Sequence, residues 1–236
     1  MEQVQNEKIV DLIRKCLNLS KSPNENEAAA ALSKAQELLE KYNLEMADIR
    51  ERLEPALFDL VDLPLTPEKK LQNWKLYLIH YVALTSMCKV ITSGKTLHIL
   101  GRGINVSATM EMSLWIINQL EELAWWHTQT YQGPDSKLSY RTSFTWGAVN
   151  RIHQRLKESQ ETRMETNPNT KALVLGTRGE LVKFTRERFP NLTSSSSYHS
   201  TNSSQGYHDG VRAGNEVSLS GANRQVYPGA LPQGGS

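Results

Sequence analysis

The segment 107–131 constrains the fold most, because its apolar residues occur on several sides of the helix that their spacing predicts. A helix that is hydrophobic nearly all round must be buried on more than one face, so other elements have to surround it. A chain of 236 residues can supply them, as one large domain or two small ones. We interpret the segment as a core helix whose methionine and tryptophan side chains pack rather than hold a cofactor. Its apolar positions are Met110, Met112, Leu114, Trp115, Ile116, Ile117, Leu120, Leu123, Ala124, Trp125 and Trp126.

Residues 1–54 carry the periodicity of two amphipathic helices. The first is predicted over 5–19. The second has an alanine-rich face, which lets a neighbouring helix approach closely, and we expect Leu32 and Leu39 to be buried there. These helices therefore form a compact hairpin module.

The second helix has start and stop signals of its own. Ser22 is a suitable cap, Pro23 suits the first helical position, and Glu25 would complete a capping box with Ser22. Asn43 is a plausible left-handed terminator, so the helix is predicted to end there. A short third helix is expected near residues 46–53.

Three runs in this module occur in a specific order: KIVDLIRKCL at 8–17, SPNENEAA at 22–29 and KAQELLEKYNL at 34–44. Together they resemble the domain-of-unknown-function family numbered 2786, an N-terminal module of bacterial and bacteriophage proteins. The rest of the chain resembles, more loosely, the C-terminal region that often follows this module in phage-encoded members. The resemblance implies an accessory protein of a phage or mobile element. It carries over no catalytic residue, because the family has no established activity.

A β-hairpin is predicted in the middle of the chain. Two short runs with strand composition, 88–92 and 95–100, flank a Ser-Gly turn. Residues 55–66 are either a linker or an edge strand, because Pro64 cannot donate a backbone hydrogen bond within a central strand.

Helical signals stand on both sides of this hairpin. Thr66 is expected to cap a helix whose buried stripe includes Trp74, Leu78 and Val82. The run GRGIN at 101–105 lacks both the full dinucleotide fingerprint and the P-loop ending. We interpret it as a tight strand-to-helix turn rather than a phosphate-binding loop.

Further helices are predicted in the second half of the chain. One covers 139–157, and another covers 179–189 and ends at Pro190, although 172–176 has the composition of a strand or of an earlier helix start. The inward positions of the first are Tyr140, Phe144, Ala148, Ile152 and Leu156.

Toward the C-terminus the pattern changes. Residues 193–204 are rich in serine, threonine and asparagine and are expected to form a loop. Gly206, Gly210 and Gly214 would share one face of a helix and allow a close contact there. Residues 227–236 have the composition of a disordered tail.

Charge is distributed unevenly along the chain. Residues 136–192 contain 11 Lys or Arg and 5 Asp or Glu, a net charge of +6, whereas residues 1–54 contain 8 and 11, a net charge of −3. Residues 55–135 carry −1 and residues 193–236 carry zero. Cationic residues interleaved with aromatic ones are typical of nucleic-acid binding, and the expected contacts are Arg141, Arg151, Arg155, Lys157 and Arg163.

The charge pattern has two alternatives to nucleic-acid binding. The basic residues could be a solvated helix face paired with Glu158, Glu161 and Glu165. The acidic N-terminal hairpin could instead engage a basic partner, as an inhibitor of a host defence or nuclease complex would. An enzyme that uses His208 and Asp209 ranks last, because no complementary residues accompany them.

The remaining expectations concern ligands and location. No His, Cys, Asp or Glu cluster has metal-ligand spacing, so neither a metal nor a cofactor is expected. The N-terminus lacks a secretory signal and no apolar run could span a bilayer, so we expect a cytoplasmic protein without membrane contact. The family resemblance implies that the cell is a bacterial host. Cys16 and Cys88 are interpreted as core residues. The sequence does not decide whether the protein forms an oligomer.

The expected fold is α+β, with a helical hairpin module followed by a mostly helical domain around a small antiparallel β-hairpin sheet. The module covers 1–54 and the α+β domain covers 55–192. Residues 193–236 would add the serine-rich loop, the glycine-spaced helix and the tail.

Overall fold

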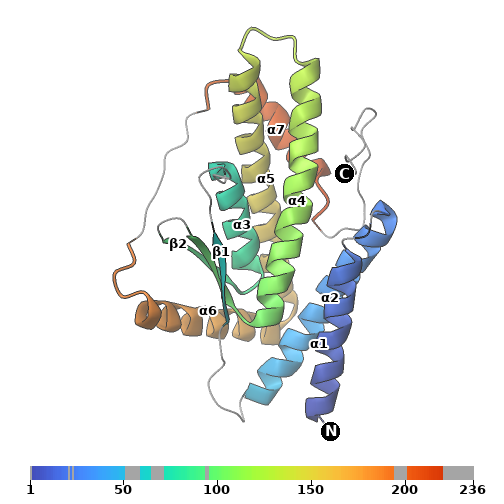
Figure 1. The fold of residues 1–236 in the computed structure, drawn as a ribbon, viewed down its shortest axis with the longest axis vertical. Helices are drawn as coiled ribbons and strands as arrows, with labels where there is room; N and C mark the ends of the chain where they lie inside the picture. The colour runs from blue at the N-terminus through green and yellow to red at the C-terminus, as the bar shows by residue number, and fades with distance from the viewer. Residues whose placement is uncertain are drawn as a thin grey trace.

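The computed structural model describes residues 2–20, 22, 24–50, 59–64, 72–93, 96–193 and 201–219. Within these ranges the chain forms helices around one small sheet, as the sequence predicts (Figure 1). The helices are α1 (Glu2–Leu19), α2 (Glu25–Arg50), α3 (Asn73–Thr85), α4 (Gly103–Thr130), α5 (Lys137–Thr166), α6 (Pro168–Arg188) and α7 (Ser204–Glu216). The strands are β1 (Asp59–Pro64), β2 (Lys89–Ser93) and β3 (Thr96–Gly101).

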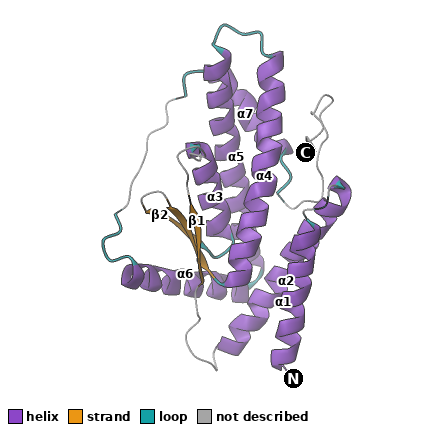
Figure 2. Cartoon of the chain, in the orientation of Figure 1, coloured by secondary structure: helices purple, strands orange, loops and turns teal. Residues whose placement is uncertain are grey.

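The sheet is antiparallel with the order β1-β3-β2, so the predicted hairpin is confirmed. Strand β1 pairs along the other side of β3, which confirms the edge-strand interpretation and places Pro64 opposite Thr96 at the end of the ladder. Both strands begin and end one residue later than predicted, so Ser93 lies in β2 opposite Thr96 and the prediction that it is a turn residue is wrong. Residues 94 and 95 lie outside the described residues. Leu97 and Ile99 face the main core, whereas Leu100 and Ile91 face α6. The sheet therefore lies between α6 and the core helices (Figure 2).

Helices α4 and α5 form a long hairpin that α3 and α7 cover (Figure 1). The five predicted inward positions of α5, from Tyr140 to Leu156, are all buried. Helix α4 is buried against several elements, as its composition predicts, but Leu114 and Trp125 stay 53% and 37% exposed. Helix α4 is therefore buried on most of its sides, but one part of its apolar surface faces solvent.

Helix α7 packs on α5 through its glycines, which confirms the predicted close contact. A Cβ atom on Gly206 would stand 2.6 Å from the carbonyl oxygen of Tyr140, and one on Gly210 would overlap the backbone of Phe144. The contact is reciprocal, because a Cβ atom on Gly147 of α5 would overlap the carbonyl oxygen of Tyr207. Side chains at these positions would force the two helices apart.

The N-terminal hairpin packs its inner face on the start of α4, at Ile104 and Ala108. Leu32 and Leu39 are 1% and 8% exposed, so both predictions of burial are confirmed. The predicted helix end at Asn43 is wrong, because α2 continues to Arg50 and includes the start of the expected third helix. Good helix formers follow the asparagine, and they outweigh its weak preference for a left-handed conformation.

The cap of α2 also differs from the prediction. The side chain of Asn24 accepts hydrogen bonds from the amides of Asn26 and Glu27, at 3.2 and 3.4 Å. The Ser22 hydroxyl donates to the Glu27 carboxylate at 2.5 Å, so the predicted cap at Ser22 is wrong. The side chain of Glu25, which the capping box would need, is not described. The reason is position: Asn24 directly precedes the first helical residue, where a capping side chain has to stand. Pro23 lies outside the described residues.

The predicted start of α6 at residue 179 is wrong, and so is a strand at 172–176. Helix α6 already begins at Pro168, because the side chain of Asn167 accepts hydrogen bonds from the amides of Asn169 and Thr170, at 2.9 and 3.4 Å. It ends at Arg188, close to the predicted end.

Other predictions fall partly outside the described residues. The stripe of Trp74, Leu78 and Val82 in α3 is buried as expected, whereas the expected cap Thr66 is not described. Residues 193 and 201–203 are loop as predicted, and 194–200 and the expected tail at 227–236 lie outside the described ranges. The turn at 101–105 connects β3 directly to α4, where a Cβ atom on Gly101 would overlap the Cys88 sulfur.

Candidate nucleic-acid interface

Helices α3 and α5 bring a set of rings together. The rings of Tyr81 and His153 stack with their centroids 3.7 Å apart and their planes 3° from parallel. His80 lies 5.8 Å from Tyr81, and Tyr77 lies between Tyr81 and Trp146, at 6.1 and 5.3 Å. Tyr77 and Tyr81 share one face of α3 because they are four residues apart. Trp146 is buried, whereas the other four rings are half-buried and reach the surface.

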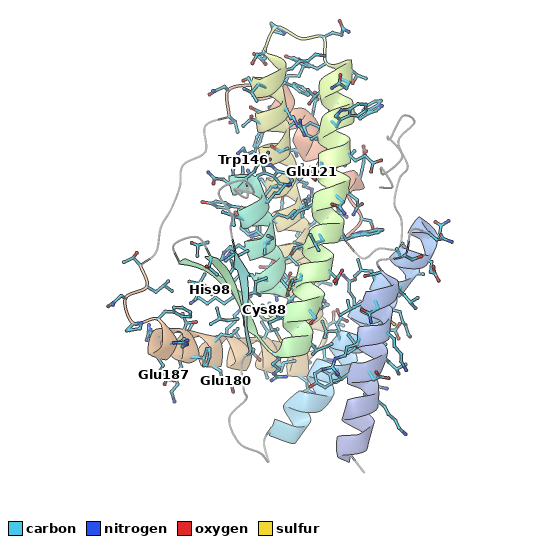
Figure 3. All side chains as sticks on the ribbon, in the orientation of Figure 1. Cys88, His98, Glu121, Trp146, Glu180 and Glu187 are labelled. Atoms are coloured by element: carbon cyan, nitrogen blue, oxygen red, sulfur yellow. The ribbon has the colours of Figure 1, made fainter. Side chains whose placement is uncertain are left out.

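Basic groups continue this set on both sides. Lys157 follows His153 by one turn of α5, Lys89 opens β2, and Arg186 lies near the end of α6. These groups lie on four elements, α5, α3, β2 and α6. We call them the basic row, which consists of Lys157, His153, His80, Lys89 and Arg186. Figure 3 labels Trp146 beside α3 and α5, and Cys88, the residue before Lys89, near the sheet.

The electrostatics show that the members of the basic row act on one another. Burial lowers the pKa of His80, and the charges of His153 and Lys89 lower it further. Burial and Lys157 lower the pKa of His153. Burial and Arg186 lower the pKa of Lys89. Each group therefore meets a positive field from its neighbours, which an anion would relieve.

Acidic groups do little to neutralise the basic row. In the described part of the chain, neither Lys89 nor Arg186 forms an ion pair. Lys157 lies 3.7 Å from Glu161, but both side chains are exposed, so this pair contributes little. The basic row can therefore attract an anionic ligand without first breaking a buried ion pair.

The predicted contact residues lie elsewhere, with one exception. Arg155 donates to the carbonyl oxygens of Gly214 and Val217, both at 2.7 Å, and so holds the end of α7. Arg151 donates to the Asn215 side chain at 2.7 Å. Both guanidinium groups thus bind α7 to α5.

The other three predicted contacts are scattered. Arg141 is exposed near the start of α5, Arg163 forms an ion pair with Glu40 of α2, and Lys157 alone belongs to the basic row. Sequence reasoning missed the rest of the row. The sequence offers one signal of it, the His-Tyr pair at residues 80 and 81, which shares a predicted helix face with Tyr77.

His208 and Asp209 do not form a catalytic pair in the described structure. Asp209 accepts a hydrogen bond from the hydroxyl of Tyr140 at 2.8 Å and forms an ion pair with Arg212, whereas His208 is exposed. Burial and the Asp209 carboxylate raise the pKa of Tyr140. Asp209 thus serves as the acceptor for a buried tyrosine. Among the described residues, no three His, Cys, Asp or Glu side chains are grouped closely enough to hold a metal ion.

Comparison with known proteins concerns the N-terminal module. Residues 8–46 match the family model described as protein of unknown function (DUF2786). The expected resemblance is thereby confirmed over α1 and most of α2, a minority of the chain. Neither the curated proteins nor the solved structures gave a match to the chain. None of the helices that the structure describes is both long and apolar enough to cross a membrane.

Proposed function

We propose that the protein binds nucleic acid across the basic row, with single strands preferred. The observation that carries this proposal is the stacked pair of Tyr81 and His153 within the basic row, whose two lysines and one arginine are cationic. Cations neutralise phosphates, and exposed rings stack on bases, so the combination suits a single-stranded backbone with unpaired bases. As part of the same proposal, the protein is an accessory protein of a phage or mobile element in the bacterial cytoplasm.

The basic row supports this function better than Arg151, Arg155 and Arg163, three of the contacts expected from the sequence. Arg151 and Arg155 already bind backbone or side-chain oxygens of α7, and Arg163 already has a carboxylate partner. Recruiting them would break contacts within the protein. Lys89 and Arg186 face no such cost.

Fluorescence anisotropy with a labelled single strand, and with its duplex, tests the proposal at several salt concentrations. Replacing Lys89 and Arg186 together by glutamine should weaken binding and flatten the slope of log affinity against log salt. The expected change is about 0.7 for each lost phosphate contact on a single strand. A matched control replaces Lys15 and Lys34 of the N-terminal hairpin by glutamine. This variant loses the same charge outside the basic row and should weaken binding less.

Two outcomes count against the proposal. Equal effects of both double variants would mean that net charge alone governs binding. Absence of binding by the parent protein at low salt would end the nucleic-acid proposal. A protein partner for the acidic hairpin would then be the better proposal, although Asp11 and Glu37 of that hairpin already pair with Lys15 and Lys34.

A further inference from the structure

A cavity of about 560 Å³ lies between the N-terminal hairpin and the helices α4, α5 and α6. Its size is within the roughly 300–1,000 Å³ of small-molecule sites. Apolar surface makes up most of its wall, although about half of the lining residues are polar, and no aromatic side chain of the described chain lines it. The leucines of the wall are Leu17, Leu32, Leu39, Leu156, Leu173 and Leu219. Such a wall fits a flexible hydrocarbon chain better than a planar base or cofactor, which usually stacks on aromatic rings.

One charged pair lines the cavity. Arg163 of α5 and Glu40 of α2 both line it and form an ion pair with each other. Their side chains are 41% and 54% exposed, so solvent and a ligand head group can reach them. Ser159, one turn before Arg163, also lines the wall. The arginine therefore already holds a carboxylate at the rim of an aliphatic cavity.

A backbone feature at the wall is independent of this pair. Met87, which lines the cavity, has φ 55°, the only positive φ of a non-glycine residue in the described chain. It follows α3 where a helix usually ends with glycine: the amide of Cys88 donates back to the carbonyl of Ala83 at 2.8 Å. Glycine would adopt this conformation without strain. The chain instead keeps a flexible thioether at the cavity wall, and strained residues of this kind occur at ligand sites.

We propose that this cavity binds an amphipathic small molecule, with an aliphatic chain among the leucines and a carboxylate head on Arg163. The head takes the place of the Glu40 carboxylate, which has the same chemistry. The cavity shares no residue with the basic row, so this site is separate from the proposed nucleic-acid interface.

Isothermal titration of the full chain, freed of bound lipid, tests the proposal with dodecanoate below its micelle concentration and with dodecanol below its solubility limit. Dodecanoate should bind at one molecule per chain and more tightly than dodecanol. Arg163→Gln should weaken dodecanoate about tenfold, the typical value of a charged hydrogen bond, and leave dodecanol unchanged. Lys137→Gln removes a charge from the same helix outside the cavity and should change neither.

A variant that fills the cavity tests whether the hydrocarbon chain of the ligand binds there. Thr170→Trp on α6 alters a half-buried residue of the wall, so the fold should survive, as its circular dichroism and melting temperature would show. It should weaken both ligands. Equal affinities for dodecanoate and dodecanol, an unchanged affinity in Arg163→Gln, or binding of many molecules per chain would each overturn the proposal. So would a dimer in native mass spectra that Thr170→Trp dissociates and dodecanoate does not, because a second copy would then occupy the cavity.

Discussion

Gly210 of α7 packs directly on the backbone of Phe144 of α5. A Cβ atom on the glycine would overlap the Phe144 carbonyl oxygen and stand 2.8 Å from the carbonyl carbon. Backbone atoms cannot move aside as a flexible side chain can. The contact between α5 and α7 therefore depends on the absence of a side chain at this position.

We expect Gly210→Ala to destabilise the protein by about 3 kcal/mol, at the upper end of the range for overpacked sites. The matched control is Gly176→Ala in α6, where an added Cβ would meet nothing within 4 Å. Alanine there should stabilise the helix by about 1 kcal/mol, because its helix propensity is higher. Urea unfolding of the two variants measures both effects. A Gly210→Ala protein as stable as the parent would contradict the close packing.

Met87→Gly should stabilise the fold by about 1 kcal/mol, since glycine adopts a positive φ without the steric cost that methionine meets. Ser86→Gly is the control, because Ser86 has φ −97° and gains nothing from glycine. Thermal unfolding of the two variants decides the prediction. A gain in Ser86→Gly equal to that in Met87→Gly would show that the left-handed conformation is not the cause.

Arg155→Gln should lower the free energy of unfolding by about 1.5–3 kcal/mol, the range for hydrogen bonds to charged groups. The lost contacts are those with the carbonyl oxygens of Gly214 and Val217. Arg141→Gln, at an exposed position of the same helix, should stay within about 0.5 kcal/mol of the parent. Chemical denaturation measures both. If the two variants were equally stable, Arg155 would be available for a ligand, as the charge pattern of the sequence predicts.

Local signals predicted the local parts of this fold. The spacing of Gly206, Gly210 and Gly214 indicated the contact face of α7, and the Ser-Gly pair indicated the hairpin. The basic row could not be found in the same way. His80, Lys89 and His153 stand on three elements, and only the packing of α3 on α5 and of the sheet beside them brings the three together.

The helix boundaries that differ from the prediction have another cause. At Asn43 the weak preference of a single residue yields to the helix formers around it. In α6, Gly176 and Gly179 indicate a boundary, because glycine is unfavourable inside helices. The buried residues Leu173, Val174 and Leu181 hold the helix together across them. Tertiary packing thus keeps α6 continuous across the two glycines.

The last prediction concerns pH. The pKa values of His80 and His153 are lowered, so both rings are neutral at pH 7 in the free protein. A bound phosphate favours the charged rings and raises both pKa values, so nucleic-acid binding should tighten as the pH falls below about 6.5. A rise of about one pKa unit would give up to tenfold tighter binding for each histidine.

The free protein should respond in the opposite direction. A histidine whose pKa is lowered by folding stabilises the fold above its unfolded value of about 6.5, and that contribution is lost as the pH falls. Anisotropy titrations at pH 7.5 and 5.5, at constant ionic strength, measure the binding effect. His80→Gln and His153→Gln should reduce it, whereas His208→Gln, at an exposed position of α7, should not. Binding with the same pH dependence in all three variants would place the nucleic acid away from Tyr81 and its neighbouring imidazoles.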